Sequence, residues 1–229
     1  MNLRRGGDQV IPRPVSWRAG DAPEWIDRDL SVLRDFDDVV ARVSTRSFDD
    51  HVRPAELAQD WVRSSRPSAV LIALVDEDGA PSVVLTRRAD HLRNHRREIS
   101  FPGGRMDEGE SAHETALREA HEEVGLHPAG VSIVSGLAPI TTFASNSFIN
   151  PVVGIVSGRP VLVPHEAEVA RVFTVPLHDL ARPDTYRNEW WETPRGEINI
   201  HFFHLDDETV WGATARMLHQ LLDVVTRPG

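Results

Sequence analysis

Cysteine and lysine are both absent from the 229-residue chain, and all 25 of its basic residues are arginine. Without cysteine the protein cannot form a disulfide framework, use a thiolate nucleophile or bind a metal through sulfur. No stretch approaches the roughly 18 consecutive apolar residues of a membrane-spanning helix. The first residues are not followed by the apolar run of a secretory signal. We therefore expect a cytoplasmic protein with no membrane partner.

Acidic residues outnumber basic ones, 35 against 25, which gives a formal net charge of −10. This excess argues against general affinity for nucleic acid, whose phosphates repel an acidic surface. Hydrophobic residues make up 40% of the chain, and the chain has six tryptophans. That content excludes wholesale disorder, and the length predicts one domain, or one domain with an appendage.

Apolar spacing divides the chain into an N-terminal arm with a helical extension, residues 1–65, and a main domain, residues 66–229. In the extension, apolar residues three and four apart predict an amphipathic helix over residues 27–43, and Pro54 is expected to begin a shorter helix. In the main domain, β-branched runs and turn signals predict strands at residues 68–75, 82–86, 131–137, 148–156 and 168–175. A hairpin is predicted with strands at residues 186–193 and 197–205, and a closing helix is predicted at residues 214–225. The mixture of elements predicts an α/β or α+β fold.

Residues 104–126, GRMDEGESAHETALREAHEEVGL, carry the strongest chemical pattern in the chain. Ser111 and Glu114 form a capping box that predicts the start of a helix, and Gly125 is a natural helix end. At about 100° per residue, two sets of side chains fall on different arcs of this helix. The acidic set comprises Glu119, Glu122 and Glu123. The apolar set comprises Leu117, Ala120 and Val124.

Three carboxylates on one helix face repel one another. A hard divalent cation with oxygen ligands, Mg²⁺ or Mn²⁺, is the simplest compensation. Just upstream, the turn Pro102-Gly103-Gly104 lets the backbone approach a ligand closely. Most glutamate-rich helix faces are simply solvated, so the spacing of the residues has to decide between the two interpretations.

The spacing of the residues favours a metal site over a solvated surface. A glycine, a glutamate, an Arg-Glu pair, a Glu-Glu pair and a second glycine stand at fixed intervals, at Gly104, Glu110, Arg118-Glu119, Glu122-Glu123 and Gly125. This pattern resembles the Nudix box, the signature of the Nudix hydrolases, at every fixed position. At a background of about 7% per residue, a chance match has a probability of about 10⁻⁸ per window.

The resemblance implies a Nudix-type α/β/α sandwich with a mixed sheet, and a reaction in which water attacks a phosphorus of a pyrophosphate. The residues implied to hold Mg²⁺ or Mn²⁺ are Glu119, Glu122 and Glu123. Arg118 and Glu110 would orient these carboxylates, and Gly104 opens the motif. Several Nudix enzymes also use a glutamate beyond the box as ligand or base. Glu168 is the candidate here, with Glu166 equally near, and the alternative is that Glu168 is a surface residue. Which carboxylate is the base stays open.

Residues 85–104, LTRRADHLRNHRREISFPGG, resemble the longer signature of the coenzyme A pyrophosphatase branch of this family. The matching residues are Leu85, Thr86, Arg88, Ala89, Leu92, Arg93, His95 and the Phe101-Pro102-Gly103-Gly104 run. The chain departs from the branch at two places: Arg97-Glu98 replaces Gly-Gln, and Asn146-Ser147 replaces a glycine and an aromatic residue. The resemblance implies coenzyme A as substrate, with 3′,5′-ADP and 4′-phosphopantetheine as products.

The same segment holds five arginines, and guanidinium groups bind phosphate bidentately. The substrate-binding candidates are Arg87, Arg88, Arg93 and His95. An equally plain interpretation is that some of these arginines balance the acidic helix. Outside this segment, His201 and His204 flank a phenylalanine pair on an expected strand and are interpreted as structural.

Two alternatives to coenzyme A hydrolysis remain. One keeps the reaction and changes the substrate to ADP-ribose, NADH or another nucleotide. The other is a Nudix domain that senses a nucleotide without hydrolysing it; the intact carboxylate set favours an enzyme. The expected partner is a small nucleotide, nucleic acid is not expected, and a homodimer is kept beside a monomer as the assembly.

Overall fold

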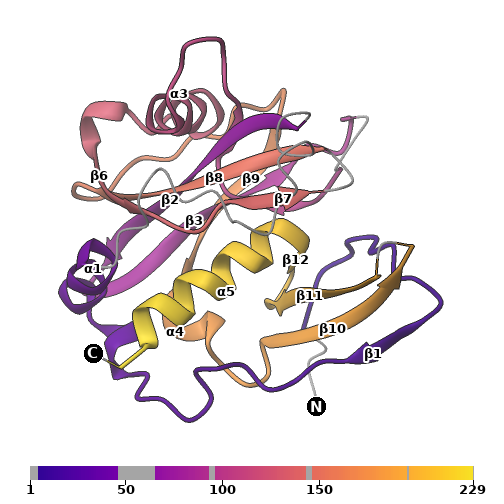
Figure 1. Cartoon of the computed structure of the whole chain (residues 1–229). Helices are drawn as coiled ribbons and strands as arrows, with labels where there is room; N and C mark the ends of the chain where they lie inside the picture. Colours follow the sequence, from indigo (N-terminus) through magenta and orange to yellow (C-terminus); the bar gives the residue numbers. More distant parts are fainter. Residues whose placement is uncertain (1–4, 46–64, 93–95, 143–145, 195, 229) are drawn as a thin grey trace.

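The structure is a computed structural model that describes residues 5–45, 65–92, 96–142, 146–194 and 196–228. Within these ranges the chain forms two β-sheets, and helices cover both faces of the larger one (Figure 1). The helices in chain order are η1 (Ser31–Arg34), α1 (Phe36–Thr45), α3 (Ala112–Val124), η2 (Pro128–Gly130), α4 (Leu177–Leu180) and α5 (Gly212–Thr226).

The larger sheet has eight strands. They are β2 (Arg66–Glu77), β3 (Ala80–Arg88), β4 (Ile99–Ser100), β5 (Gly103–Arg105), β6 (Val131–Gly136), β7 (Ile140–Thr142), β8 (Ser147–Val156) and β9 (Val169–Pro176). The main path runs β4-β3-β2-β8-β6, while β5, β7 and β9 pair with β2, β8 and β3. The sheet is mixed, because β2 and β8 run parallel whereas β2 and β3 run antiparallel.

The strand β2 shows how the sequence pattern builds this sheet. Its residues 68–75 are all buried, as expected for a continuous apolar run whose two faces are both covered. Because side chains alternate along a strand, Ile72 joins the core beneath α5, and Leu71 joins the core beneath α3. Figure 1 shows α3 on one side of the sheet and α5 on the other. The result is the expected α/β/α sandwich.

The smaller sheet lies beside α5 and contains four antiparallel strands. They are β1 (Trp17–Ala19), β10 (Tyr186–Thr193), β11 (Gly196–His204) and β12 (Thr209–Trp211). The hairpin of β10 and β11 confirms the predicted one, with Thr193 opposite Gly196 at its turn.

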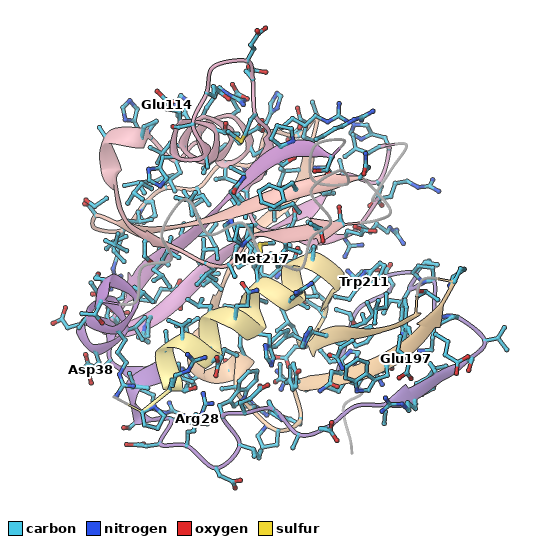
Figure 2. The ribbon with its side chains drawn as sticks, in the orientation of Figure 1. Arg28, Asp38, Glu114, Glu197, Trp211 and Met217 are labelled. Atoms are coloured by element: carbon cyan, nitrogen blue, oxygen red, sulfur yellow. The ribbon has the colours of Figure 1, made fainter. Side chains whose placement is uncertain are left out.

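Residues 5–30, called the N-terminal arm below, run along the smaller sheet and return to α5. The arm supplies β1, which pairs with β10. Near its end, Arg28 forms an ion pair of 2.7 Å with Asp223, and Figure 2 shows Arg28 beside the C-terminal end of α5. Figure 2 also labels Met217 on the opposite side of α5, where it is buried against the larger sheet.

Most of the predicted elements are confirmed, but the prediction of one helix over residues 27–43 is wrong. The periodicity predicted a single helix over residues 27–43, but the chain forms η1 and then α1, separated by Asp35 in an extended conformation. The carboxylate of Asp35 accepts a hydrogen bond of 2.9 Å from the backbone N–H of Asp38, so Asp35 caps the second helix instead of continuing the first. The shorter helix predicted from Pro54 lies outside the described residues.

None of the helices in the described ranges is long and apolar enough to cross a membrane. The predicted division at residue 65 stays a prediction, although the described part of the extension packs into the main core. Val39 and Val43 of α1, for example, belong to the same buried cluster as Ile72 of the larger sheet.

Candidate active site

The helix α3 carries the candidate site and begins and ends where its sequence predicted. The side-chain oxygen of Ser111 accepts from the backbone N–H of Glu114, and the carboxylate of Glu114 accepts from the backbone N–H of Ser111. Gly125 ends the helix with a φ of 72°, a left-handed conformation that suits glycine. Both ends of the helix are therefore fixed by contacts between residues close in sequence.

The apolar face of α3 differs slightly from the prediction. Ala116, Ala120 and Val124 are the fully buried apolar residues, whereas Leu117 is only half-buried. The small side chains let the helix lie close to β2 and β8, so the carboxylates on its flank come near the backbone of β5.

Arg118 ties the acidic residues of the box together. Its Nε and Nη2 donate to the two carboxylate oxygens of Glu110, at 2.8 and 3.1 Å. Its Nη1 donates to both Glu119, at 2.9 Å, and Glu122, at 3.1 Å. A planar guanidinium can hold several carboxylates at once, so Arg118 sets the orientation of the acidic flank.

Glu110 is a fixed member of this network. It also accepts from the backbone N–H of Asp107 at 3.0 Å and from the hydroxyl of Thr115 at 2.8 Å. The Arg118 guanidinium is the main reason why the pKa of Glu110 falls to about 2. Glu110 is thus a permanent carboxylate that anchors Arg118. Sequence reasoning missed Thr115 as its partner, although its spacing of five residues from Glu110 was visible.

Glu119 and Glu123 reach beneath the helix to the glycine turn. A carboxylate oxygen of Glu123 accepts a hydrogen bond of 3.2 Å from the backbone N–H of Gly103. A Cβ at Gly104 would lie 2.3 Å from Oε1 of Glu119. Glycine is needed at position 104 because the carboxylate of Glu119 rests on its backbone. The two parts of the motif, separated in sequence, are therefore in direct contact.

Burial distinguishes the three predicted metal ligands. The side chain of Glu123 is 5% exposed, that of Glu119 is 15% exposed, and that of Glu122 is 56% exposed. Burial raises the pKa of Glu123 to about 7 and also raises the pKa of Glu119. The N–H of Gly103 and the guanidinium of Arg88 oppose the rise at Glu123. Carboxyl groups whose pKa values are raised by burial are found preferentially at functional sites.

The donor chemistry of this flank fits a hard divalent cation. All the donors are carboxylate oxygens, which Mg²⁺ and Mn²⁺ prefer. Burying two carboxylates beside a third costs free energy, and a bound cation would offset that cost. As the side chains stand, no three acidic or histidine residues in the described ranges are close enough together to enclose a metal ion. Arg118 bridges two of the candidate ligands instead.

Glu168 approaches the same flank from the strand β9 side. The backbone N–H of His165 donates to the carbonyl of Glu123 at 2.8 Å, which fixes the segment before β9 against the end of α3. The charge of the exposed Glu168 is felt by both Glu119 and Glu123, where it raises the pKa. The structure thus brings Glu168 to the box glutamates, and its role as a ligand stays a prediction.

The structure separates the predicted arginines. Arg88 lies on the side of α3, with Nη1 3.8 Å from Oε1 of Glu123. Arg87 points to the other face of the sheet, where it pairs with the buried Glu208 at 2.9 Å and with Asp8 at 3.1 Å. Strand alternation explains the difference. Arg93 and His95 lie outside the described residues, so the structure does not place them.

Comparison with known proteins identifies the family. The NUDIX domain model matches residues 65–192. The uncharacterized Nudix hydrolase NudL of Yersinia enterocolitica is 36% identical over 189 residues, which cover 80% of this chain and 95% of that protein. Nudix hydrolase 3 of Caenorhabditis elegans is 37% identical over 174 residues, covering 69% of this chain and 72% of that protein.

Among solved structures, the Nudix hydrolase RenU of M. smegmatis covers 52% of this chain and 78% of its own, with 22% identity and a TM-score of 0.44. The family model alone spans more than half of the sequence and contains the whole box from Gly104 to Leu126. The protein therefore belongs to the Nudix hydrolases, enzymes that hydrolyse pyrophosphate bonds.

Proposed function

We propose that this Nudix hydrolase cleaves coenzyme A or its derivatives into 3′,5′-ADP and 4′-phosphopantetheine. The single observation that carries the proposal is the placement of Arg88 beside Glu123. Arg88 belongs to the 85–104 segment that resembles the coenzyme A branch, and Glu123 belongs to the Nudix box. The branch-specific motif and the hydrolytic motif thus meet at one point of the molecule.

The cofactor we propose is Mg²⁺ or Mn²⁺, in keeping with the general use of divalent metals in the family. Glu119, Glu122 and Glu123 would hold it, and Glu168 would add a ligand from the β9 side. A divalent cation at such a site neutralises phosphate charge and makes a bound water more acidic.

The chain itself supplies positioning and electrostatics, which are most of what phosphoryl-type displacement requires. Arg118 keeps the acidic flank oriented through its bonds to Glu110, Glu119 and Glu122. Arg88 would offer a phosphate a donor at the edge of that flank, since its side chain is 28% exposed and its Nε has no hydrogen-bond partner among the described residues. A guanidinium in this state gains from meeting an anion.

A substrate panel tests the proposal. Coenzyme A, its oxidised and acylated forms, ADP-ribose, NADH, diadenosine polyphosphates and nucleoside triphosphates would be incubated with Mg²⁺ and with Mn²⁺. We expect metal-dependent release of 3′,5′-ADP from coenzyme A. Efficient turnover of another compound with none of coenzyme A would reject the substrate. Tight nucleotide binding without any turnover would favour the sensor alternative.

The metal site is tested by removing one charge. We expect Glu123→Gln, and likewise Glu122→Gln, to lower kcat by at least about a hundredfold, equivalent to about 2.7 kcal/mol of barrier. Glu108→Gln is the matched control, because Glu108 is an exposed glutamate of the same segment. Near-native rates in both box variants would disprove the assignment.

A further inference from the structure

Arg97 has a backbone conformation that its residue type disfavours. Its φ is 62°, in the left-handed region that glycine adopts without cost. In the described ranges, the other non-glycine residues with positive φ are Asp78 and Asn146. Aspartate and asparagine tolerate this region, whereas a long unbranched side chain such as arginine gains nothing from it locally. Something beyond the local sequence must therefore hold Arg97.

Two residues of the N-terminal arm supply much of that support. Nη1 of Arg97 donates to the carboxylate of Asp8 at 2.7 Å, and its Nη2 donates to Asp90 at 3.1 Å. The backbone carbonyl of Arg97 accepts a hydrogen bond of 3.2 Å from the side-chain amide of Gln9. The arm thus forms hydrogen bonds with both the side chain and the main chain of Arg97.

The backbone of Arg97 is hydrogen-bonded to that of Arg88, whose side chain lies beside Glu123 of the Nudix box. Its backbone N–H donates to the carbonyl of Arg88 at 3.3 Å, and the N–H of Arg88 donates to the carbonyl of Glu98 at 3.0 Å. These bonds fix the end of β3, at a point where the register with β9 shifts between Arg87 and Arg88. A strand end of this kind relies on few ladder bonds, so each bond matters for where the Arg88 side chain points.

Asp8 reaches both sides of this strand end. Besides Arg97, it pairs with Arg87 at 3.1 Å, and Arg87 is held again by the buried carboxylate of Glu208. Gln9 also donates to Glu208. The arm therefore anchors Arg87, which precedes Arg88 in the strand, and Arg97, which lies opposite Arg88. Arg88 itself points towards Glu123.

We propose that Asp8 and Gln9 of the N-terminal arm are positioning residues for the hydrolytic site, acting through the left-handed backbone of Arg97 to place Arg88 beside Glu123. The proposal rests on the role of Arg88 given under the proposed function. It assigns the arm, far from the Nudix box in sequence, a part in substrate binding. A purely structural arm would instead hold the smaller sheet and leave substrate affinity alone.

A double-mutant cycle separates the two roles, because glycine adopts the conformation of Arg97 unaided. With the panel compound that the enzyme hydrolyses best, we expect Asp8→Ala to raise KM about fivefold, with kcat little changed. Arg97→Ala loses the anchors but keeps the strained backbone, and should raise KM about tenfold. Arg97→Gly should restore KM to within about twofold of the native value. In that glycine background, adding Asp8→Ala should change KM by less than about twofold.

A control variant and a second readout accompany the cycle. Arg13→Ala removes another ion pair of the arm, to the buried Glu189 at 2.6 Å, and should lower Tm without changing KM. Amide hydrogen exchange at Arg88 and Arg97 needs no substrate. We expect it to accelerate about tenfold in Asp8→Ala and to be unaffected by Asp8→Ala in the glycine background.

Equal KM and exchange effects of Asp8→Ala in the two backgrounds would overturn the proposal, as would the absence of any effect in the native background. If coenzyme A is not hydrolysed, the substrate assignment fails on its own. The exchange measurements would still decide whether the arm acts through Arg97.

Discussion

Glu110 and Glu123 are the same side chain in two environments, and their pKa values differ accordingly. Guanidinium contacts lower the pKa of Glu110 to about 2, while burial raises that of Glu123 to about 7. At neutral pH the first is a fixed charge and the second exchanges its proton easily. The sequence presents both as glutamates of one motif, and the packing around each decides which one stays charged at neutral pH and which one has a raised pKa.

Gly104 gives a residue-scale prediction. The nearest atoms to a Cβ there would be those of the Glu119 carboxylate, the far end of a flexible side chain, with Oε1 at 2.3 Å. Gly104→Ala should therefore change Tm little while moving the carboxylate, and we expect kcat/KM to fall about thirtyfold or more. Steady-state kinetics and thermal unfolding measure the two effects. Gly130→Ala is the control, since a Cβ at Gly130 would enter open space. Unchanged activity in Gly104→Ala would contradict the contact.

The departures from the coenzyme A branch acquire a physical meaning at this scale. Arg97 and Asn146 stand where the branch has glycine, and both have positive φ, 62° and 49°. The backbone of this chain thus adopts a conformation typical of glycine at both places. The sequence identified the two departures from the motif, but only the structure shows the left-handed main chain there.

At the scale of elements, α3 is the unit that local sequence specifies best. Its start and its end were both predicted from residues 104–126, and both are confirmed. The helix at residues 27–43 was not predicted correctly, because apolar periodicity continues through Asp35 while the chain does not. A side chain such as that of Asp35 can hydrogen-bond to a nearby backbone N–H and so end one helix and begin another. The spacing of apolar residues carries no information about such a hydrogen bond.

The cap of α3 gives an element-scale prediction. Ser111→Ala removes the side-chain acceptor of the Glu114 N–H and one half of the capping box. We expect the free energy of unfolding to fall by about 1 kcal/mol, measured by urea denaturation. Ser132→Ala, at an exposed position on β6, should have a much smaller effect. Equal effects of the two changes would show that the cap adds no stability.

At the scale of the whole molecule, a buried aromatic and histidine cluster joins the arm, the smaller sheet and α5. The rings of His201 and His219 lie 4.3 Å apart. Tyr186 contacts His201 through a hydrogen bond of 2.7 Å, and Trp25 of the arm packs on Tyr186. The interpretation of His201 as structural agrees with this position. Nothing in the local pattern of β11 indicated the partners.

This cluster predicts how stability depends on pH. Burial lowers the pKa of His201 to about 3, below the value of about 6.5 expected in the unfolded chain. Between these values the unfolded chain binds a proton that the native protein excludes. The stabilisation is therefore complete above about pH 6.5 and declines as the pH falls, by at most about 1.4 kcal/mol per pH unit.

Urea unfolding at several pH values between 7.5 and 4 measures this effect. His201→Gln should show a shallower loss of stability with acidification than the native protein. His165→Gln, which changes an exposed histidine, should leave the pH dependence unaltered. A native-like slope in His201→Gln would show that His201 does not carry the effect.

The sequence by itself determined the Nudix box, five of the eight strands of the larger sheet and both ends of α3, because each depends on residues close together in the chain. Only the tertiary structure decided which glutamates are buried, which arginine faces them and which residues the N-terminal arm contacts. Arg87 and Arg88 are neighbours in the sequence, yet one pairs with Glu208 and the other lies beside Glu123. Burial and long-range ion pairs depend on residues brought together from distant parts of the chain, and no local pattern encodes those encounters.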